Sequence, residues 1–276
     1  MRRPVSTETT GSTESPAAPT ARPDLAVHLD GAVAVLEIRR PPANYFDEEL
    51  VGAIVDTARG LDEDPACRAL VLCSQGKHFC AGADFGDDIG FGDERVTVSD
   101  GLYRRAVQLF RTRKPIIAAV HGAAVGGGLG LACAADFRVA DPSARFAANF
   151  ARLGFHQGFG LSVTLPRIVG AQHAADMLYT GRRIDGSHAA RIGLVDRLAD
   201  PGTSRATALA WAHEIAAAAP LAVTSIRATL RAGLADQVEQ ALAHELTEQA
   251  RLWATEDCAE GIGADLQRRR PTFHGR

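Results

Sequence analysis

The chain has 276 residues, of which 46% are hydrophobic and 23% are charged, a composition typical of a globular protein with a sizeable core. Its formal net charge of −3 gives no basic footprint for nucleic acid, and no apolar run reaches the roughly eighteen residues that a membrane-spanning helix needs. We therefore expect neither nucleic acid nor a membrane as a partner. Five cysteines, odd in number and set mostly in apolar patterns, favour buried thiols in a reducing compartment, and we predict a cytoplasmic protein.

The N-terminal segment 1–23 is rich in Ser, Thr, Pro and Ala and has almost nothing to bury. This composition predicts a disordered tail. Because no apolar segment follows Arg2 and Arg3, we do not expect a secretory signal, and a transit peptide is a minor alternative.

Strand and helix patterns alternate after the tail. Residues 25–39 predict two strands turned at Asp30-Gly31, and Asp47 is placed to cap a helix that begins with two glutamates. Further along, strands are expected at 69–73 and 116–120, and helices at 101–112 and 129–135. Such alternation implies right-handed crossovers and a mostly parallel sheet, hence an α/β fold.

The last third of the chain is predicted to be helical. Asp185 is placed to cap a short helix that ends at Ala190, a longer helix over 204–219 ends before Pro220, and helices follow over 221–233 and 236–255. The apolar faces of these helices need a partner, so residues 201–276 are predicted to form an oligomerisation region.

A glycine cluster follows the central strand in KPIIAAVHGAAVGGGLGLACAAD, residues 114–136. Gly126, Gly127 and Gly128 allow positive φ angles and close approach to their N–H groups at the start of a helix, where negative charge is favoured. A tight turn whose glycines only permit close packing is the alternative, and this stretch alone leaves both interpretations open.

A second stretch, KHFCAGADF at 77–85, follows the strand at 69–73. The two stretches together resemble the enoyl-CoA hydratase/isomerase (crotonase) superfamily. The similarity runs from about residue 24 to the C-terminus and includes RRPPANYFDEEL, LPRIVG, YTGRRIDGSHAARIGLVDRL and ATEDCAEGIGADLQRRRPTF.

The resemblance implies a spiral of β-β-α repeats over 24–200, followed by a helical trimerisation region. It implies an acyl-CoA thioester substrate, with coenzyme A as part of that substrate and no other cofactor, in a homo-oligomer that is a trimer or a dimer of trimers. By the same resemblance, the N–H groups of Ala83 and Gly127 form an oxyanion hole for the thioester enolate. Arg268, Arg269 and Phe273 would reach a neighbour's adenine pocket, although a solvated helix end is the alternative for these arginines.

The sequence departs from the hydratase pattern at both catalytic glutamates. One is expected two residues after the glycine triplet, where this chain has Gly130, and the other where it has Phe150. Because one positioned acid or base contributes on the order of 10²–10⁴ in rate, hydration of a simple enoyl thioester should be weak. Gly130 and Phe150 are predicted to make the acyl pocket apolar and roomier.

His156 is the candidate replacement catalyst, because its ordinary pKa of roughly 6.5 suits proton transfer near neutrality; a structural histidine in a Gly-rich turn is the alternative. His78 and His121 are expected to tie down backbone carbonyls. The residues predicted to bind substrate are Ala43, Ala81, Asp84, Phe85, Gly126, Gly130, Asn149, Phe150 and Arg152.

The acidic, Gly-rich segment 84–100 is predicted to be a mobile loop over this site. It is either a lid whose Phe85, Ile89 and Phe91 close on the acyl group or a solvated surface loop. Its aspartates lack EF-hand spacing, so we expect no metal site.

Three functions stay open at this stage. The first is an enolate-stabilising hydratase or isomerase with a non-standard catalytic set; the second is a decarboxylase or carbon–carbon bond hydrolase of the same fold. The third is a catalytically silent acyl-CoA binding subunit. The chain has no G-x-S-x-G, P-loop or H-E-x-x-H motif that would favour another chemistry.

Overall fold

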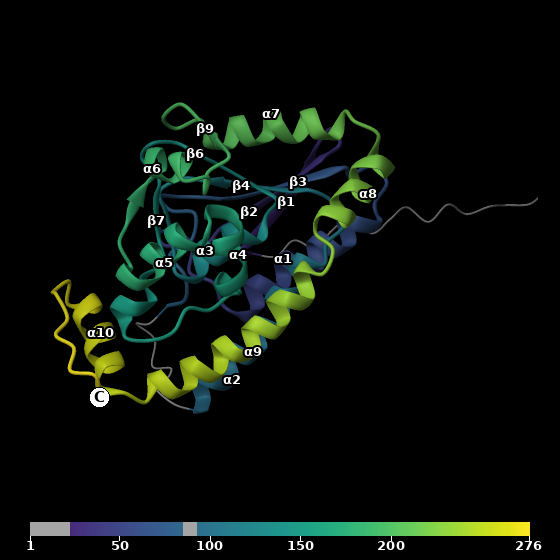
Figure 1. Ribbon diagram of the computed structural model, residues 1–276. Coiled ribbons are helices and arrows are strands. Elements are labelled where there is room, and N and C mark those ends of the chain that lie inside the picture. Colours follow the sequence, from purple (N-terminus) through teal and green to yellow (C-terminus); the bar gives the residue numbers. More distant parts are fainter. Residues whose placement is uncertain (1–22, 85–92) are drawn as a thin grey trace, which may run out of the picture.

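The computed structural model of the chain describes residues 23–84 and 93–276 (Figure 1). The strands are β1 (Leu25–Asp30), β2 (Val33–Ile38), β3 (Ala69–Ser74), β4 (Ile116–Val120), β5 (Ala123–Val125), β6 (Phe137–Ala140), β7 (Arg145–Ala147), β8 (Ile184–Asp185) and β9 (Arg197–Leu198). The helices are α1 (Glu48–Glu63), α2 (Asp93–Phe110), α3 (Gly127–Ala134), the 3₁₀ helix η1 (Asn149–Leu153), α4 (Leu161–Val169), α5 (Ala171–Thr180), α6 (Gly186–Arg191), α7 (Ser204–Ala216), α8 (Pro220–Leu230), α9 (Leu234–Trp253) and α10 (Glu256–Leu266). The predicted tail lies outside the described residues except for Pro23, as do Phe85, Ile89 and Phe91.

Two sheets carry the fold. The larger has the order β1-β2-β3-β4-β6-β9, in which β1 and β2 are antiparallel and every other pair is parallel. The smaller has the order β5-β7-β8. The mostly parallel α/β sheet predicted from the sequence is therefore confirmed.

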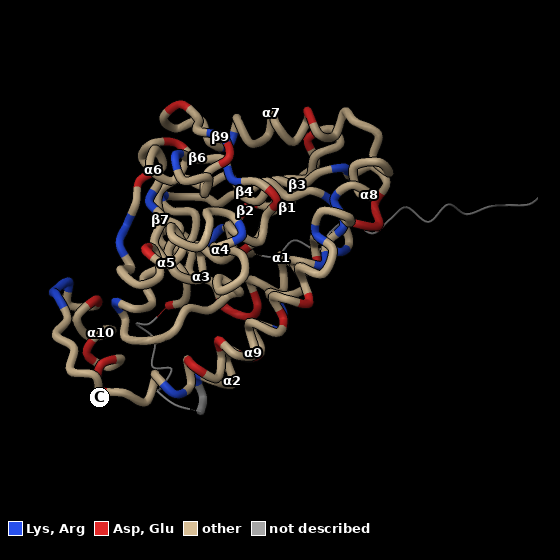
Figure 2. The backbone as a smooth tube through the Cα atoms, viewed as in Figure 1, with Lys and Arg blue, Asp and Glu red and all other residues tan. Residues whose placement is uncertain are grey.

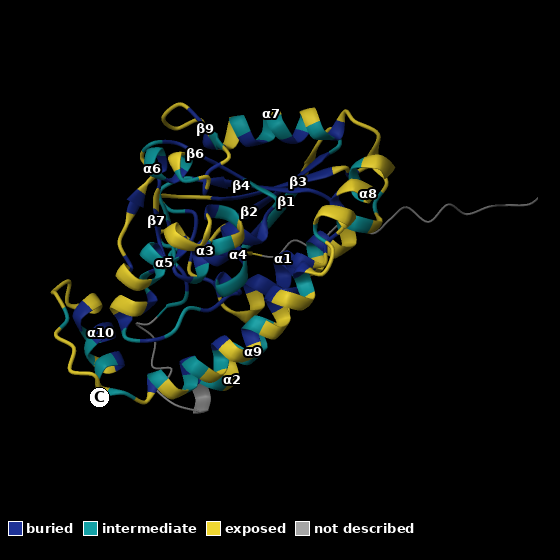
Figure 3. Ribbon diagram, in the orientation of Figure 1, coloured by how far each residue is buried: buried dark blue, intermediate teal, exposed yellow. Residues whose placement is uncertain are grey.

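The large sheet is buried on both faces because its strands alternate side chains between two cores. Val33 and Val35 of β2 pack on one side with Ala208 and Ala212 of α7, whose small residues four apart let the helix lie close to the strands. Leu36, from the other face of β2, joins the larger core with α1, α2 and α3. Figure 3 shows the strands as a buried centre under these helices.

Helix caps were predicted well from the sequence. The carboxylate of Asp47 accepts the N–H of Leu50 at the start of α1, and that of Asp185 accepts the N–H of His188 in α6. Pro220 follows the end of α7, but it is also the first residue of α8. Proline has no N–H, and at the first position of a helix this costs nothing because that N–H would have no partner within the helix.

Three short or late helices, α4, α5 and α10, were not predicted. The loop prediction for 84–100 is wrong over its second half, because α2 begins at Asp93 and packs along α1 and α9. This packing holds a weakly periodic segment in helical form.

All five cysteines are buried free thiols, as predicted. No single helix in residues 23–84 and 93–276 is long and apolar enough to cross a membrane; α7 and α8 meet that test only as a pair bent by 108°. Acidic and basic residues both occur on the outer helices α7 and α9 (Figure 2).

Candidate functional site

The two motifs that carried the family resemblance lie side by side. The turn after β3 joins the strand before α3 through two backbone bonds, from the N–H of Cys80 to the carbonyl of Ala123 and from the N–H of Val125 to the carbonyl of Cys80. A β-carbon at Gly82, where φ is +92°, would lie 3.0 Å from the carbonyl oxygen of Val125 and 3.6 Å from the nitrogen of Gly127. The residue after Gly82 therefore lies close to the start of α3.

The N–H groups of Ala83 and Gly127 have no acceptor among the described residues. Gly127 is the first residue of α3, so its N–H has no partner within the helix, and Gly126 offers no capping side chain. Both residues line one cavity. The positive end of the α3 dipole reinforces these donors for a developing negative charge.

The glycines of the cluster serve close packing. A β-carbon at Gly128 would lie 2.1 Å from the carbonyl oxygen of Cys80, and one at Gly127 would lie 2.3 Å from Cζ of Phe46. Gly126 has a φ of +56°, a left-handed conformation that suits glycine. The packing interpretation thus holds at Gly128, while Gly127 combines close packing with an unpartnered N–H.

The cavity has a volume of about 790 Å³. Its lining falls into three groups by position in the fold. The central group comes from the chain before α1, the turn after β3 and the start of η1. The basic group lies on the segments after β3 and β4, in β7 and before β8, and the aromatic group comes from α2, η1, the segment after η1 and α9. The main members are Ala43, Tyr45, Ala81, Asp84 and Asn149 in the central group, Lys77, His78, His121, Arg145 and Arg183 in the basic group, and Arg95, Tyr103, Phe150, Phe155, Gln249 and Trp253 in the aromatic group.

Aromatic rings connect the centre of the cavity to α9. Cζ of Phe150 would lie 3.8 Å from a β-carbon at Gly126. The Phe150 and Phe155 rings meet edge to face with centroids 5.6 Å apart, and Phe155 lies 6.0 Å from Trp253. An apolar wall therefore extends from the glycine cluster to the end of α9, and Phe150 forms part of it.

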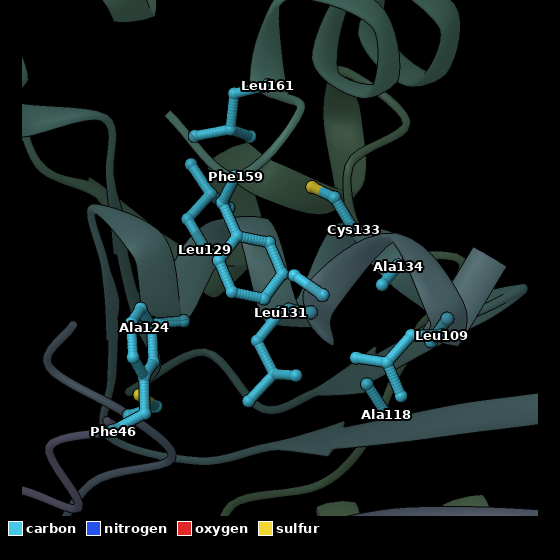
Figure 4. Close-up of a cluster of buried hydrophobic side chains, with 14 of the residues drawn as sticks. Phe46, Leu109, Ala118, Ala124, Leu129, Leu131, Cys133, Ala134, Phe159 and Leu161 are labelled. Carbon is cyan, nitrogen blue, oxygen red and sulfur yellow. The ribbon is translucent and has the colours of Figure 1, made fainter. Parts of the chain in front are cut away.

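Gly130 does not line this cavity, so the prediction that it enlarges the acyl pocket is wrong. A β-carbon there would lie 2.5 Å from Cβ of Phe159, a buried residue that adopts a φ of +60°. Phe159 packs beside Leu129 and Leu131 of α3 in Figure 4. Its side chain fills the space into which a side chain at position 130 would extend.

His156 and Arg152 also lie outside the cavity lining. Nδ1 of His156 lies 2.8 Å from the carbonyl oxygen of Gln157, and its ring contacts that of His244 on α9 edge to face. Arg152 is exposed, with its aliphatic stem against Gly181 at the end of α5. The structure therefore does not bring either side chain to the Ala83 and Gly127 nitrogens, and the geometry favours the structural alternative for His156.

The other predicted residues do gather at the centre. Ala43 accepts a hydrogen bond from the N–H of Ala81, which ties the chain before α1 to the turn. Oδ1 of Asn149 would lie 3.1 Å from a β-carbon at Gly126, and no described residue bonds to the Asn149 amide. Asp84 and Gly126 line the cavity, whereas Phe85 lies outside the described residues.

The two histidines beside the turns differ in role. Nε2 of His121 lies 2.9 Å from the carbonyl oxygen of Gly76, as predicted. Nδ1 of His78, however, accepts the N–H of Ala123. Burial and the nearby Lys77 ammonium lower the pKa of His78, which keeps its ring neutral and able to accept this bond.

A polar pair within the aromatic group escaped the sequence analysis. The hydroxyl of Tyr103 donates to Oε1 of Gln249 at 2.9 Å, and Nε2 of Gln249 donates to the carbonyl oxygen of His156 at 3.0 Å. Glu245, Gln249 and Trp253 are buried on one face of α9, four residues apart. The sequence signal for this pair was the presence of two polar residues, Glu245 and Gln249, on an otherwise apolar face of the helix.

Glu245 of α9 caps the start of α4. Its carboxylate accepts the N–H groups of Gly160 and Ser162 at the start of α4, each at 2.9 Å. Burial nevertheless raises the pKa of Glu245.

The chain end folds back on its own last helix. Arg269 pairs with Glu260 and Phe273 is partly exposed. The predicted contact of Arg268, Arg269 and Phe273 with a neighbour's adenine pocket stays a prediction. Within the described ranges, no three His, Cys, Asp or Glu side chains lie close enough to hold a metal ion.

Comparison with known proteins identifies relatives over most of the chain. The family model described as enoyl-CoA hydratase/isomerase matches residues 28–276. A crotonyl-CoA hydratase from Syntrophomonas wolfei is 34% identical over 87% of this chain and 94% of its own length, and a putative enoyl-CoA hydratase from Thermus thermophilus is 36% identical over 88% and 98%. The crystal structure of an enoyl-CoA hydratase/isomerase from Pseudoalteromonas atlantica superposes with a TM-score of 0.81 at 30% identity, covering 91% of this chain and all of that one.

Proposed function

Because this chain belongs to the enoyl-CoA hydratase/isomerase family, we propose that it binds an acyl-CoA thioester and stabilises its enolate between the N–H groups of Ala83 and Gly127. The observation that carries this proposal is that two backbone donors, which have no acceptor in residues 23–84 and 93–276, line one cavity beside Gly82. Each fixed donor of this kind contributes roughly 3 kcal/mol to a transition state in which negative charge develops on oxygen.

The basic group supports coenzyme A as the other half of the ligand. Lys77, Arg145 and Arg183 line the cavity. Asp141 lines it as well, but its carboxylate already accepts hydrogen bonds from Ser143, Gly202 and Ser204. Positive charge therefore predominates where the phosphates of coenzyme A would lie. The thioester supplies coenzyme A, and we propose no other cofactor.

The reaction itself uses a catalytic set other than two glutamates. Phe150 presents an aromatic ring to the cavity, and the space beside Gly130 is filled by Phe159. Polar side chains of the central group that line the cavity include Tyr45, Asp84 and Asn149. Water activation and proton delivery by paired carboxylates are thus replaced by fewer or weaker groups, so proton transfer that shifts a double bond is favoured over hydration.

Decarboxylation or carbon–carbon cleavage is the second candidate, and Phe150 is the observation that favours it. When a bond from the α-carbon to a carboxylate breaks, its electron pair forms the enolate and carbon dioxide leaves, so no general base is needed. An aromatic wall also disfavours the charge of that carboxylate in the ground state. Water then supplies the proton to the α-carbon.

The test of the proposed function combines titration with turnover. We expect acyl-CoA thioesters to bind, and crotonyl-CoA to be hydrated at least about 10³-fold more slowly than by a family hydratase, measured by loss of the enoyl-thioester absorbance. His156→Ala should leave turnover unchanged, given the orientation of its ring. Hydration at an ordinary hydratase rate would contradict the role given to Phe150 and Phe159, and binding without turnover of any thioester would indicate a silent acyl-CoA binding subunit.

We also propose that the chain forms trimers or dimers of trimers in the cytoplasm. Helix α8 carries large apolar side chains that are exposed in the single chain, namely Leu221 at 84%, Ile226 at 58% and Leu230 at 69%. Contact with a second copy would remove this surface from water. The buried, unpaired thiols agree with a reducing compartment.

A further inference from the structure

The far end of the apolar wall is polar, although it is buried. Arg95 and Tyr103 of α2 line the same cavity as Gln249 and Trp253 of α9. Arg95 and Trp253 are 7% and 4% exposed, and Gln249 is 1% exposed. Burying a guanidinium and an amide costs free energy. A site for a plain hydrocarbon chain requires neither group.

Two of these side chains are hydrogen-bonded to each other. The Tyr103 hydroxyl donates to Gln249, whose amide donates in turn to a backbone carbonyl. A β-carbon at Gly158 would lie 1.9 Å from the Tyr103 hydroxyl oxygen and 2.6 Å from Nε2 of Gln249, so this pair depends on a glycine. The fold therefore makes room for polar groups at this end of the cavity.

The indole of Trp253 differs from this pair. Its Nε1 is buried and has no hydrogen-bond partner among the described residues, whereas the ring packs against Phe155. Buried indole N–H groups normally find an acceptor. The Trp253 ring lies two ring-to-ring steps along the wall from Phe150, so its N–H could meet the distal part of an acyl chain.

On the basis of the proposed acyl-CoA function, we propose that Trp253 and Arg95 form a subsite for a carboxylate at the distal end of the acyl group. The indole N–H would donate to one carboxylate oxygen, and the guanidinium would supply the positive charge that favours an anion over a neutral group. The substrate is then the mono-CoA thioester of a dicarboxylic acid, held at one end by the Ala83 and Gly127 nitrogens and at the other by this subsite.

The experiment compares thioesters of equal chain length by calorimetric titration of the full-length protein. The ω-carboxyacyl-CoA series from glutaryl to suberoyl is measured against straight-chain acyl-CoA of the same carbon number. We expect at least one ω-carboxyacyl-CoA to bind about tenfold tighter or more than its straight-chain counterpart, the size of one hydrogen bond to a charged group.

Two variants test whether Trp253 and Arg95 cause the preference for the ω-carboxyacyl-CoA. Trp253→Phe keeps an aromatic ring against Phe155 but removes the N–H, and Arg95→Gln removes the charge; each should reduce the ratio of the two dissociation constants toward one. Trp211→Phe is the matched control, because that indole lies on α7 against Phe137 and Arg197, and it should keep the wild-type ratio. Circular dichroism checks that each variant is folded.

The possible results separate this inference from the proposed function. Equal binding of the paired thioesters by the wild type, or a preference that survives in both Trp253→Phe and Arg95→Gln, would overturn the subsite while leaving the acyl-CoA function in place. Tighter binding of ω-hydroxyacyl-CoA than of the ω-carboxy compound would overturn the carboxylate assignment. If no CoA thioester binds at all, the proposed function fails and this inference with it.

Discussion

Phe159 occupies the space of a side chain at position 130, and this can be tested through stability. In Gly130→Ala, the new β-carbon would lie 2.5 Å from Cβ of Phe159 and 2.8 Å from its Cγ and Cδ1, inside a core where both residues are buried. Overpacking of this kind costs about 1–3 kcal/mol. The helix propensity of alanine returns about 0.8–1.0 kcal/mol, so the variant should be destabilised by up to about 2 kcal/mol.

The change in the free energy of unfolding caused by Gly130→Ala should have the opposite sign when residue 159 is a glycine. Phe159→Gly removes the clashing β-carbon and suits the φ of +60°, although loss of the ring destabilises the protein in its own right. In that background Gly130→Ala should stabilise by up to about 1 kcal/mol. Gly60→Ala in α1 is the control, because nothing lies within 4 Å of a β-carbon there, and it should stabilise in both backgrounds.

Urea unfolding of the four proteins of this cycle gives the coupling free energy between positions 130 and 159. We expect about 1–3 kcal/mol. A coupling below about 0.5 kcal/mol, with alanine tolerated equally in both backgrounds, would refute the reasoning. A functional version follows, in which Gly130→Glu and Phe150→Glu should raise crotonyl-CoA hydration only when combined with Phe159→Gly.

Three further predictions concern the whole molecule. Burial raises the pKa of Cys80 to about 12 and that of Cys133 to about 11, so a thiolate-selective reagent should react slowly with these thiols in the native protein at about pH 8 and with five thiols after unfolding; rapid native reaction of these two would contradict their burial. Because the raised pKa of Glu245 disfavours its charged form, its stabilising contribution is present below about pH 4.3 and is lost as the pH rises through the folded-state pKa. The free energy of unfolding of the wild type, relative to Glu245→Gln, should therefore fall as the pH increases from about 4, and a constant difference would rule this out. Sedimentation should show trimers or hexamers that Leu221→Glu shifts toward the monomer, whereas a stable wild-type monomer at micromolar concentration would count against association through α8.

The parts of the fold that were predictable depend on neighbouring residues. Asp47 and Asp185 cap helices because a short acidic side chain reaches an N–H three residues later, a contact that sequence spacing fixes. The nitrogen of Gly127 is unpartnered because it begins a helix with no capping side chain before it. Such features follow from local chemistry, whereas the pairing of Ala83 with Gly127 was implied by the family resemblance.

The parts that were missed depend on contacts between distant residues. The contact between Gly130 and Phe159 joins α3 to the chain before α4, and no local pattern indicates it. His156 has a sequence position suited to catalysis, but its ring turns toward His244 on α9. Helix α2 is longer than its weak periodicity predicted because α1 and α9 pack along it. Tertiary packing decided each of these outcomes.

The most direct test of enolate stabilisation by backbone donors is the infrared carbonyl stretch of a bound thioester. The ligand is a saturated acyl-CoA with a ¹³C-labelled thioester carbonyl, and the proteins are the wild type, Gly127→Ala and Gly127→Pro. Both variants place a β-carbon against Phe46, so they share that steric cost, but only proline removes the N–H, at a first helical position that accepts it. We predict a shift to lower frequency on binding to the wild type, largely kept by Gly127→Ala and largely lost by Gly127→Pro. An unshifted carbonyl in the wild type, or the same shift in both variants, would contradict the account.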